Sequence, residues 1–313
     1  MKIINLCECF IFYNTFLFSF THGSVKKGVG VDPRGFLCDD FKALNNMFWW
    51  YDWGANLENI RKNSNCSNIY RYIDNFIPMI WGRWTVRNVS IPDQAAYLLG
   101  FNEPNHFEQS NLTALEAANY WPDIEKLANG RLLVSPAAAQ CGGPKCHGNT
   151  TQWFDKFFMY CRGCRVDYLA THYYSCNVDD TMAFLKNLFE RYGKKIWLTE
   201  FACPYAVSPA KELKFMKELL PKLEAAPFIF RYAWFASRIK KGTFVTPASS
   251  LLQSDSSTLT TLGSFYNDFT TNENATEPSS NATEPSSNAT EPSSWFRMLL
   301  KGLRWIWTFV LSI

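Results

Sequence analysis

The sequence has no large excess of charge of one sign. Its 313 residues include 31 Lys and Arg against 28 Asp and Glu, a formal net charge of +3. Scattered charges in this balance argue against a nucleic-acid partner, which needs a concentrated basic surface. Charged residues make up only 19% of the chain and hydrophobic residues 47%, so the chain can bury one large core.

The chain also lacks a clean membrane-spanning run at its N-terminus. An apolar stretch covers residues 3–20, but Glu8 and Asn14 interrupt it. The small residues Thr21 and Gly23 suit cleavage before Ser24, so residues 1–23 are predicted to be a secretory signal peptide. An uncleaved anchor or a buried helix is the alternative, and the polar interruptions make the anchor a poor membrane span.

Cysteines and glycosylation acceptors independently indicate a secreted or extracellular, cell-surface protein. Outside the leader the cysteines are even in number: Cys38, Cys66, Cys141, Cys146, Cys161, Cys164, Cys176 and Cys203. Four of them, with His147, could be interpreted as a zinc site, but an oxidising compartment favours disulfides. Asn-x-Ser/Thr acceptors begin at Asn65, Asn88, Asn111, Asn149, Asn274, Asn281 and Asn288.

Short apolar runs alternate with helix-like segments over residues 24–269. Eight runs read as strands buried on both faces: residues 27–31, 48–53, 76–81, 97–102, 132–137, 166–173, 196–201 and 229–235. Helices are expected at 112–128, 180–192, 210–223 and 259–269, and, from weaker patterns, at 40–46 and 56–69. Eight repeats favour an α/β fold of the closed (β/α)8 TIM-barrel type.

The composition changes abruptly after the last expected helix. The heptad Asn-Ala-Thr-Glu-Pro-Ser-Ser occurs three times within residues 270–294, without large apolar side chains, and indicates an extended glycosylated stalk. Residues 295–313 combine Trp and Leu with Arg297, Lys301 and Arg304 on one helical face. This tail fits a membrane-surface helix, a lipid-anchor signal or a helix packed on the barrel.

Two glutamates stand just past apolar strands. Glu103 lies in Gly100-Phe-Asn-Glu-Pro-Asn105 and Glu200 in Trp197-Leu-Thr-Glu-Phe201. The carboxyl ends of barrel strands carry the catalytic groups in this fold, and two carboxyl groups can cleave a glycosidic bond. The 17% content of Phe, Trp and Tyr also suits a protein that stacks rings on sugar faces. A glycoside hydrolase is therefore predicted, and no cofactor or metal is expected.

An ordered set of motifs resembles glycoside hydrolase family 128, the alkali-sensitive-linkage type of glycosyl hydrolase core. The motifs are Lys27-Gly-Val-Gly-Val31, Tyr51-Asp-Trp-Gly54, Leu99-Gly-Phe-Asn-Glu-Pro-Asn105, Val134-Ser-Pro-Ala137, Val166-Asp-Tyr-Leu-Ala-Thr-His-Tyr-Tyr174, Ile196-Trp-Leu-Thr-Glu-Phe-Ala202 and Tyr232-Ala-Trp-Phe235. The resemblance covers about residues 27–269. It implies a retaining clan-A barrel acting on β-1,3-glucan, with Glu103 as acid/base and Glu200 as nucleophile.

The same resemblance implies roles for three further residues. Asn102 would hold the sugar 2-hydroxyl, and His172 and Tyr174 would shape the reacting subsite and help position Glu200. The family usually has Trp where this chain has Tyr173, which bears on the stacking surface and chain-length preference. From their places at strand ends, we expect four aromatic residues to line the glucan cleft: Tyr51, Trp53, Trp81 and Trp234.

The function expected from the sequence is a secreted or surface-tethered endo-β-1,3-glucanase that acts as a monomer. A non-catalytic β-glucan-binding surface glycoprotein is the main alternative, although recognition alone needs no pair of positioned carboxylates. A surface glycoprotein whose barrel displays the stalk is a third. Since Cys176 and Cys203 follow strands that should be neighbours, a disulfide between them is also predicted.

Overall fold

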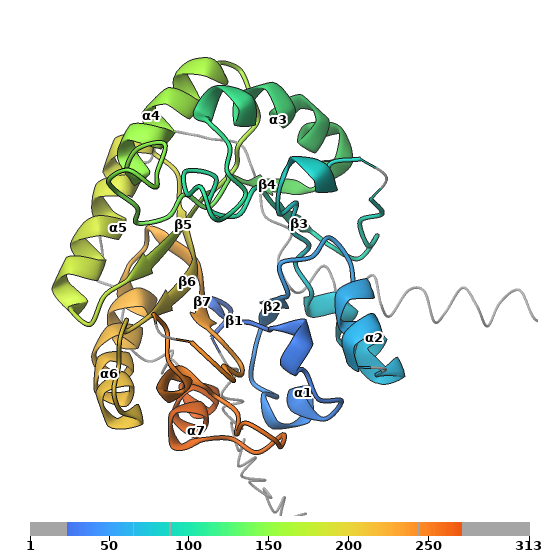
Figure 1. Ribbon diagram of the computed structural model, residues 1–313, viewed down its shortest axis with the longest axis vertical. Coiled ribbons are helices and arrows are strands. Elements are labelled where there is room, and N and C mark those ends of the chain that lie inside the picture. Colours follow the sequence, from blue (N-terminus) through green and yellow to red (C-terminus); the bar gives the residue numbers. More distant parts are fainter. Residues whose placement is uncertain (1–23, 65, 88, 243, 271–313) are drawn as a thin grey trace, which may run out of the picture. The chain divides into compact units, whose positions relative to one another are not determined.

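The computed structural model describes residues 24–270, apart from residues 65, 88 and 243. The expected signal peptide (1–23), the stalk from residue 271 onward and the tail (295–313) lie outside the described residues, as do Asn65 and Asn88. In the described part, parallel strands lie at the centre and helices surround them (Figure 1). This arrangement confirms the predicted parallel α/β architecture and is TIM-barrel-like.

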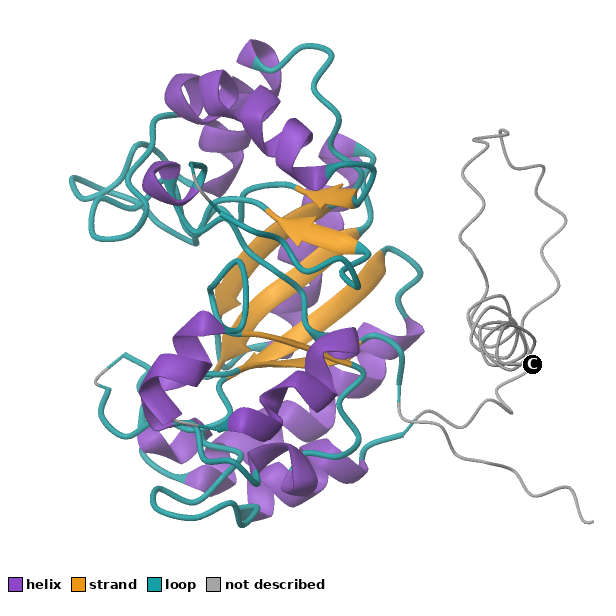
Figure 2. Ribbon diagram, turned by 90° about the vertical axis from the view of Figure 1, so that its right-hand side faces the viewer, coloured by secondary structure: helices purple, strands orange, loops and turns teal. Residues whose placement is uncertain are grey.

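Seven strands form in the described part, rather than the eight expected. They are β1 (Lys27–Gly30), β2 (Trp49–Tyr51), β3 (Tyr97–Leu99), β4 (Leu132–Val134), β5 (Leu169–Tyr174), β6 (Ile196–Ala202) and β7 (Ile229–Phe235). All their pairings are parallel. They make one sheet in the order β2-β1-β7-β6-β5 and a second of β3 and β4. Figure 2 shows the strands in the middle of the described part, with helices on both sides of them.

The missing strand is the one expected at residues 76–81. Pro78 interrupts it, because proline has no N–H to donate to a ladder. The segment still bridges its neighbours, since Ile77 N donates to Trp50 O at 2.9 Å and Ile80 N donates to Leu99 O at 2.9 Å. A further isolated bridge joins Val134 to Tyr168. The segment therefore runs between β2 and β3, where the sequence placed it, without regular strand pairing.

Helices cover the outside of the strands, and most begin where the sequence places a cap. Their bounds are α1 (Asp40–Ala43), α2 (Glu58–Ser64), α3 (Ala114–Ala128), α4 (Thr150–Tyr160), α5 (Val178–Tyr192), α6 (Pro209–Ala225) and α7 (Thr261–Asp268). Helix α3 starts after a capping box of Thr113 and Glu116. Helix α4 was not expected, although Asn149 and Gln152 form a capping box before it.

Four 3-10 helices complete the described elements: η1 (Pro33–Gly35), η2 (Ser67–Asn75), η3 (Arg83–Thr85) and η4 (Pro247–Ser249). Trp49, Trp50, Trp121, Trp153 and Trp197 are fully buried in the core. No helix of the described residues has the length and apolar character needed to cross a membrane.

The eight cysteines outside the leader form four disulfides: Cys38–Cys66, Cys141–Cys146, Cys161–Cys164 and Cys176–Cys203. The zinc interpretation of the second and third pairs is therefore wrong, because their sulfur atoms bond to each other. The predicted Cys176–Cys203 bridge is confirmed, with Cα atoms 4.5 Å apart. It ties the loops that follow β5 and β6, next to the expected catalytic residues.

Candidate active site

A cleft of about 1000 Å³ opens at the carboxyl ends of the strands. Its lining includes Trp53, Trp81, Asn102, Glu103, Tyr174 and Glu200, which are six of the nine predicted site residues. They come from segments spread over 150 residues of sequence and meet because parallel strands end at the same edge. A concave site with aromatic walls and a few convergent polar groups is the usual form of a ligand site.

Glu200 forms the base of the cleft on β6. Its side chain is almost completely buried, and both carboxylate oxygens accept hydrogen bonds. Trp53 Nε1 donates to Oε1 at 2.7 Å, and Tyr174 Oη donates to Oε2 at 2.5 Å. Tyr51 was expected to line the cleft, but it is fully buried beneath Glu200, with its hydroxyl 2.9 Å from Thr199 O and 3.5 Å from Glu200 Oε1. These donors hold the carboxylate in one orientation.

Burial raises the pKa of Glu200, and the nearby charge of Glu103 raises it further. The positive charge of His172 and the hydrogen bonds from Tyr174 and Trp53 oppose that effect. The ionised form of Glu200 therefore depends on its donors, since burial in an apolar surrounding favours the neutral acid. Glu200 is the more buried of the two glutamates, with 6% of its side chain exposed against 13% for Glu103.

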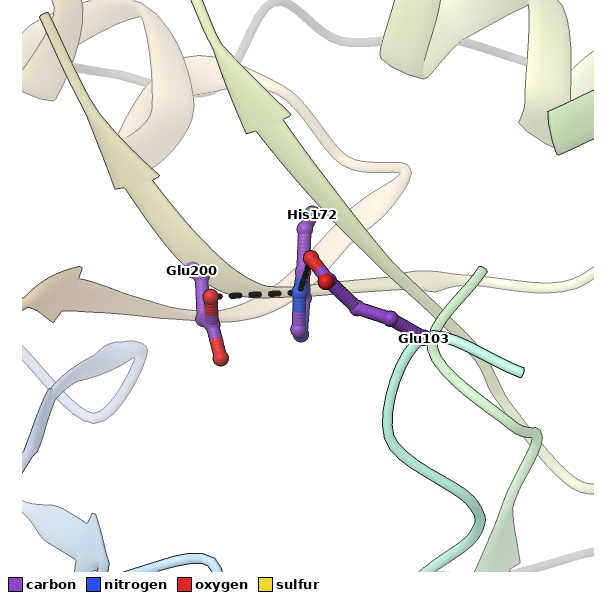
Figure 3. A group of neighbouring side chains, drawn as sticks. All are labelled: Glu103, His172 and Glu200. Carbon is purple, nitrogen blue, oxygen red and sulfur yellow. Dashed lines mark hydrogen bonds and ion pairs between the residues drawn. The ribbon is translucent and has the colours of Figure 1, made fainter. Parts of the chain in front are cut away.

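His172 lies between the two glutamates (Figure 3). Its Nδ1 is 2.7 Å from Glu103 Oε1 and 3.2 Å from Glu200 Oε2. The register of β5 on β6 pairs His172 with Glu200, next to an irregularity between Thr171 and His172. Burial alone would lower the pKa of this imidazole, but the two carboxylates outweigh it and raise the pKa. A protonated His172 can thus donate toward either glutamate.

Glu103 stands on strained backbone. Its φ is 41°, in the left-handed region that non-glycine residues rarely adopt, and its N–H donates to Ala137 O at 2.9 Å. The Glu103 side chain is partly exposed to the cleft, whereas the His172 side chain is fully buried. Strain of this kind persists only where the surrounding structure imposes it, and it concentrates at functional sites.

Asn102 lies beside Glu103 on the cleft wall. Its Nδ2 donates to Gln109 Oε1 at 3.2 Å, while its Oδ1 is buried and has no hydrogen-bond partner among the described residues. Asp52, next to Trp53, is a second buried polar group on this wall, and its Oδ1 accepts from Gly54 N. Burial raises the pKa of Asp52 to about 7.

Trp234 does not reach the cleft. It is fully buried, and its Nε1 donates to Ser249 O at 2.7 Å. Side chains alternate along a strand, so Trp234 packs against Tyr266 of α7 while its neighbour Phe235 lines the cleft. The sequence placed the aromatic pair correctly at the end of β7 but assigned the cleft to the wrong member. The alternation of side chains along the strand was the available signal, but it assigns the faces only when one residue is already known to point into the cleft.

Three side chains of the site could also hold a metal ion by their spacing. One ligand atom from each of Glu103, His172 and Glu200 lies within 4.8 Å of the others. The 2.7 Å between His172 Nδ1 and Glu103 Oε1 is the length of a direct hydrogen bond. Hydrogen bonding between these side chains therefore explains why they lie so close together.

Comparisons with known proteins agree with this geometry. Residues 35–266 match the family model described as glycosyl hydrolase catalytic core. A curated relative, alkali-sensitive linkage protein 1 of Schizosaccharomyces pombe, is 28% identical over 235 residues. The match covers 72% of this chain but 40% of that protein, so the chain spans less than half the length of this relative.

Two solved structures extend the comparison. A subgroup II endo-β-1,3-glucanase of family 128 from Sorangium cellulosum has 33% identity and a TM-score of 0.67, over 78% of this chain and 98% of its own. A subgroup I endo-β-1,3-glucanase from Amycolatopsis mediterranei, in complex with laminaritriose, has 27% identity and a TM-score of 0.61, over 78% and 99%. With the family model matched over most of the described residues, the chain belongs to glycoside hydrolase family 128 and is a glycoside hydrolase.

Proposed function

We propose that the protein is a retaining endo-β-1,3-glucanase that uses Glu103 as acid/base and Glu200 as nucleophile. The observation that carries the proposal is the closeness of the two carboxyl groups, with one oxygen of each within 4.8 Å. Retaining glycosidases hold their carboxyl groups about 5–5.5 Å apart, while inverting enzymes leave about 6.5–9.5 Å for a water molecule.

The two surroundings support this division of roles. Glu200 is oriented by Trp53 and Tyr174, and an oriented, ionised carboxylate is what attack on the anomeric carbon requires. Glu103 has fewer partners and keeps contact with the cleft, so its proton can pass to the oxygen of the leaving sugar. In the second step, Glu103 takes a proton from water, and the hydroxyl displaces Glu200 from the anomeric carbon.

The substrate class follows from the relatives and from the cleft. Both structural relatives above are endo-β-1,3-glucanases, and one binds laminaritriose. Trp53, Trp81 and Phe235 offer ring faces along the cleft, where the apolar faces of glucose units can pack. Asn102 stands beside Glu103, in reach of the sugar at the reacting carbon, and would hold its 2-hydroxyl.

Incubation of the purified protein with laminarin tests the function. We expect oligosaccharides of several lengths from the first minutes, as endo cleavage gives, and proton NMR should show β-anomers first. Release of glucose alone would identify exo action, and initial α-anomers would contradict retention. Binding of laminarin without any product would instead favour the non-catalytic glucan-binding protein.

We also propose that the protein is secreted or displayed at the cell surface. Four disulfides favour an oxidising compartment, which supports this location.

We further propose that the strands close into a complete barrel. The isolated bridges around residues 76–79 and between Val134 and Tyr168 support closure of the two sheets into one eight-membered barrel. A single domain with its own cleft needs no second copy, so a monomer is proposed.

A further inference from the structure

Two large aromatic side chains are exposed at the edge of the cleft, one in its lining and one beside it. Tyr205, in the loop after β6, is 65% exposed, and Phe244, in the loop after β7, is 43% exposed. Large apolar groups that gather on a surface mark contact sites more often than single exposed residues do. Their rings lie 5.4 Å apart between centroids, edge to face, so they form one surface.

This surface continues the aromatic wall of the catalytic cleft. Ring centroids follow one another from Trp53 to Phe235 at 5.6 Å, to Tyr174 at 5.8 Å, and to Phe244 at 5.0 Å. Tyr174 is the residue that holds Glu200, and Phe244 lines the cleft while it contacts Tyr205. An unbroken series of rings thus leads from the nucleophile to the outer surface.

The loops that carry the two rings are held in place. Tyr205 N donates to Phe244 O at 2.7 Å, and Thr246 Oγ1 donates to Ala206 O at 2.7 Å. Tyr205 has a φ of 54°, a strained conformation for tyrosine, and it follows the Cys176–Cys203 disulfide by two residues. These contacts hold the Tyr205 ring at one position on the surface.

A second hollow lies on the far side of Tyr205. Its volume is about 720 Å³, and its lining includes Tyr205, Val207, Pro209 and Thr246. Tyr205 thus lines this hollow and also contacts Phe244 of the catalytic cleft.

We propose that Tyr205 and Phe244 form an outer glucan-binding subsite, which stacks a glucose unit of the chain beyond those held at Glu103 and Glu200. The proposal rests on the proposed function and extends it, since it makes the length of the glucan a determinant of affinity. Glucose presents C–H groups on its ring faces, and aromatic faces contact them without a precisely oriented hydrogen bond. Short oligosaccharides that end within the cleft do not reach this subsite.

The test compares kcat/KM for laminaritriose and laminarihexaose in the full-length protein. In Tyr205→Ala the hexaose-to-triose ratio should fall about two- to tenfold, the range expected from one lost aromatic contact. Tyr205→Phe keeps the ring and should keep the wild-type ratio. Tyr160→Ala removes an equally polar, 47% exposed tyrosine at the end of α4 and should behave as wild type.

An unchanged hexaose-to-triose ratio in Tyr205→Ala would overturn the proposal. If kcat/KM fell equally for both substrates, the loss would indicate a structural effect on Tyr174 rather than a lost subsite. If the wild type hydrolysed neither oligosaccharide, the proposed function would fail. Measurement of oligosaccharide binding would then show whether the outer subsite exists. Isothermal titration with laminarihexaose should give a Kd two- to tenfold higher for Tyr205→Ala than for wild type. Equal Kd values, or no binding by wild type, would remove the subsite.

Discussion

Backbone strain in the described part of the chain gathers around the cleft. Five non-glycine residues there have left-handed φ values, and three of them are Trp53, Glu103 and Tyr205. Trp53 holds Glu200, Glu103 is the proposed acid/base, and Tyr205 belongs to the proposed outer subsite. Asn129 instead ends α3, where a left-handed residue is ordinary. Residues that cost folding energy are thus placed where the chemistry needs a set geometry.

The roles of the two glutamates can be separated by rescue. Glu103→Gln and Glu200→Gln should each lower turnover of laminarin by several orders of magnitude without loss of fold, because each removes a reacting carboxyl group. Azide should restore cleavage of an activated aryl β-glucoside in Glu103→Ala with a β-azide product, and in Glu200→Ala with an α-azide. NMR of the azide products checks the assignment, and the reverse pattern would mean that the roles are exchanged.

The indole of Trp53 should set the acidic limit of activity. Trp53→Phe keeps a ring but removes the N–H that favours ionised Glu200, so the pKa of Glu200 should rise further. Since the nucleophile must be ionised, activity should then be lost at a higher pH as the pH falls. At the wild-type optimum kcat should fall by about ten- to a hundredfold, since a hydrogen bond to a charged group contributes about 1.5–3 kcal/mol.

The pH profile of kcat for Trp53→Phe and wild type measures this shift. Trp81→Phe is the matched control, because Trp81 lines the same cleft and has no hydrogen bond to Glu200 among those described. Its acidic limb should stay at the wild-type position. A limb that does not move in Trp53→Phe would show that the indole does not hold the charge of Glu200.

At the scale of elements, the register of the strands produces the active site. β5 and β6 pair so that His172 stands beside Glu200, and the isolated bridge between Asn102 and Ala137 fixes the chain just before Glu103. Helix α6 supports the end of β6 through Glu212, whose Oε2 accepts from Cys203 N at 3.1 Å and whose Oε1 accepts from the Ser249 hydroxyl. A buried acid therefore joins α6, β6 and η4.

Glu212 should make stability depend on pH. Burial raises its pKa from 4.5 to about 7, so the native state binds more protons than the unfolded state between these values. Its contribution is therefore complete below about pH 4.5 and is lost as the pH rises through 7. Asp52, with a pKa raised to about 7 by burial, acts in the same direction.

The free energy of unfolding should accordingly fall by a few kcal/mol between pH 5 and 8, with about 3 kcal/mol from Glu212 at most. Glu212→Gln can keep both partners, with its amide oxygen accepting from Cys203 N and its amide nitrogen donating to the Ser249 hydroxyl, and it should flatten this slope. Glu218→Gln, on an exposed position of the same helix, should leave the slope unchanged. Urea unfolding at each pH measures the difference, and equal slopes in wild type and Glu212→Gln would contradict the argument.

At the scale of the whole molecule, we expect the sequence beyond residue 270 to decide where the enzyme acts. The repeats and the Trp-rich basic tail lie outside the described residues. Their composition predicts that the tail attaches the protein to a membrane and that the stalk separates the barrel from the membrane surface. Deletion of residues 295–313 should release active enzyme into the medium of expressing cells, measured as laminarin hydrolysis by medium and cell fractions.

Phosphatidylinositol-specific phospholipase C should cause the same release only if the tail is a lipid-anchor signal. Full-length protein found free in the medium with Ile313 still attached would rule out that signal. Failure of this protein to bind liposomes as well would leave a tail that packs on the protein surface.

The sequence alone was sufficient for the parallel α/β architecture, the family and the pairing of Cys176 with Cys203. The architecture and the family follow from local signals, because buried strands, helix caps and motif residues are each encoded within a few neighbouring positions. The disulfide followed from the expectation that the strands before its two cysteines are neighbours, and the catalytic roles of Glu103 and Glu200 stay predictions. Even the segment at residues 76–81 was placed correctly between its neighbours, although Pro78 prevents a regular strand. Helix α4 was missed despite its capping box, since aromatic residues such as Trp153 and Phe157 suit several structures.

Only the tertiary structure decided which side chains meet. It turned Trp234 into the core and Phe235 into the cleft, gave Glu200 its donors from Trp53 and Tyr174, and brought Tyr205 beside Phe244. These contacts join residues that lie 15 to 147 positions apart in the sequence. The direction of a side chain depends on strand register and twist, and the pKa of a carboxyl group depends on everything packed around it, so neither is encoded in a local pattern.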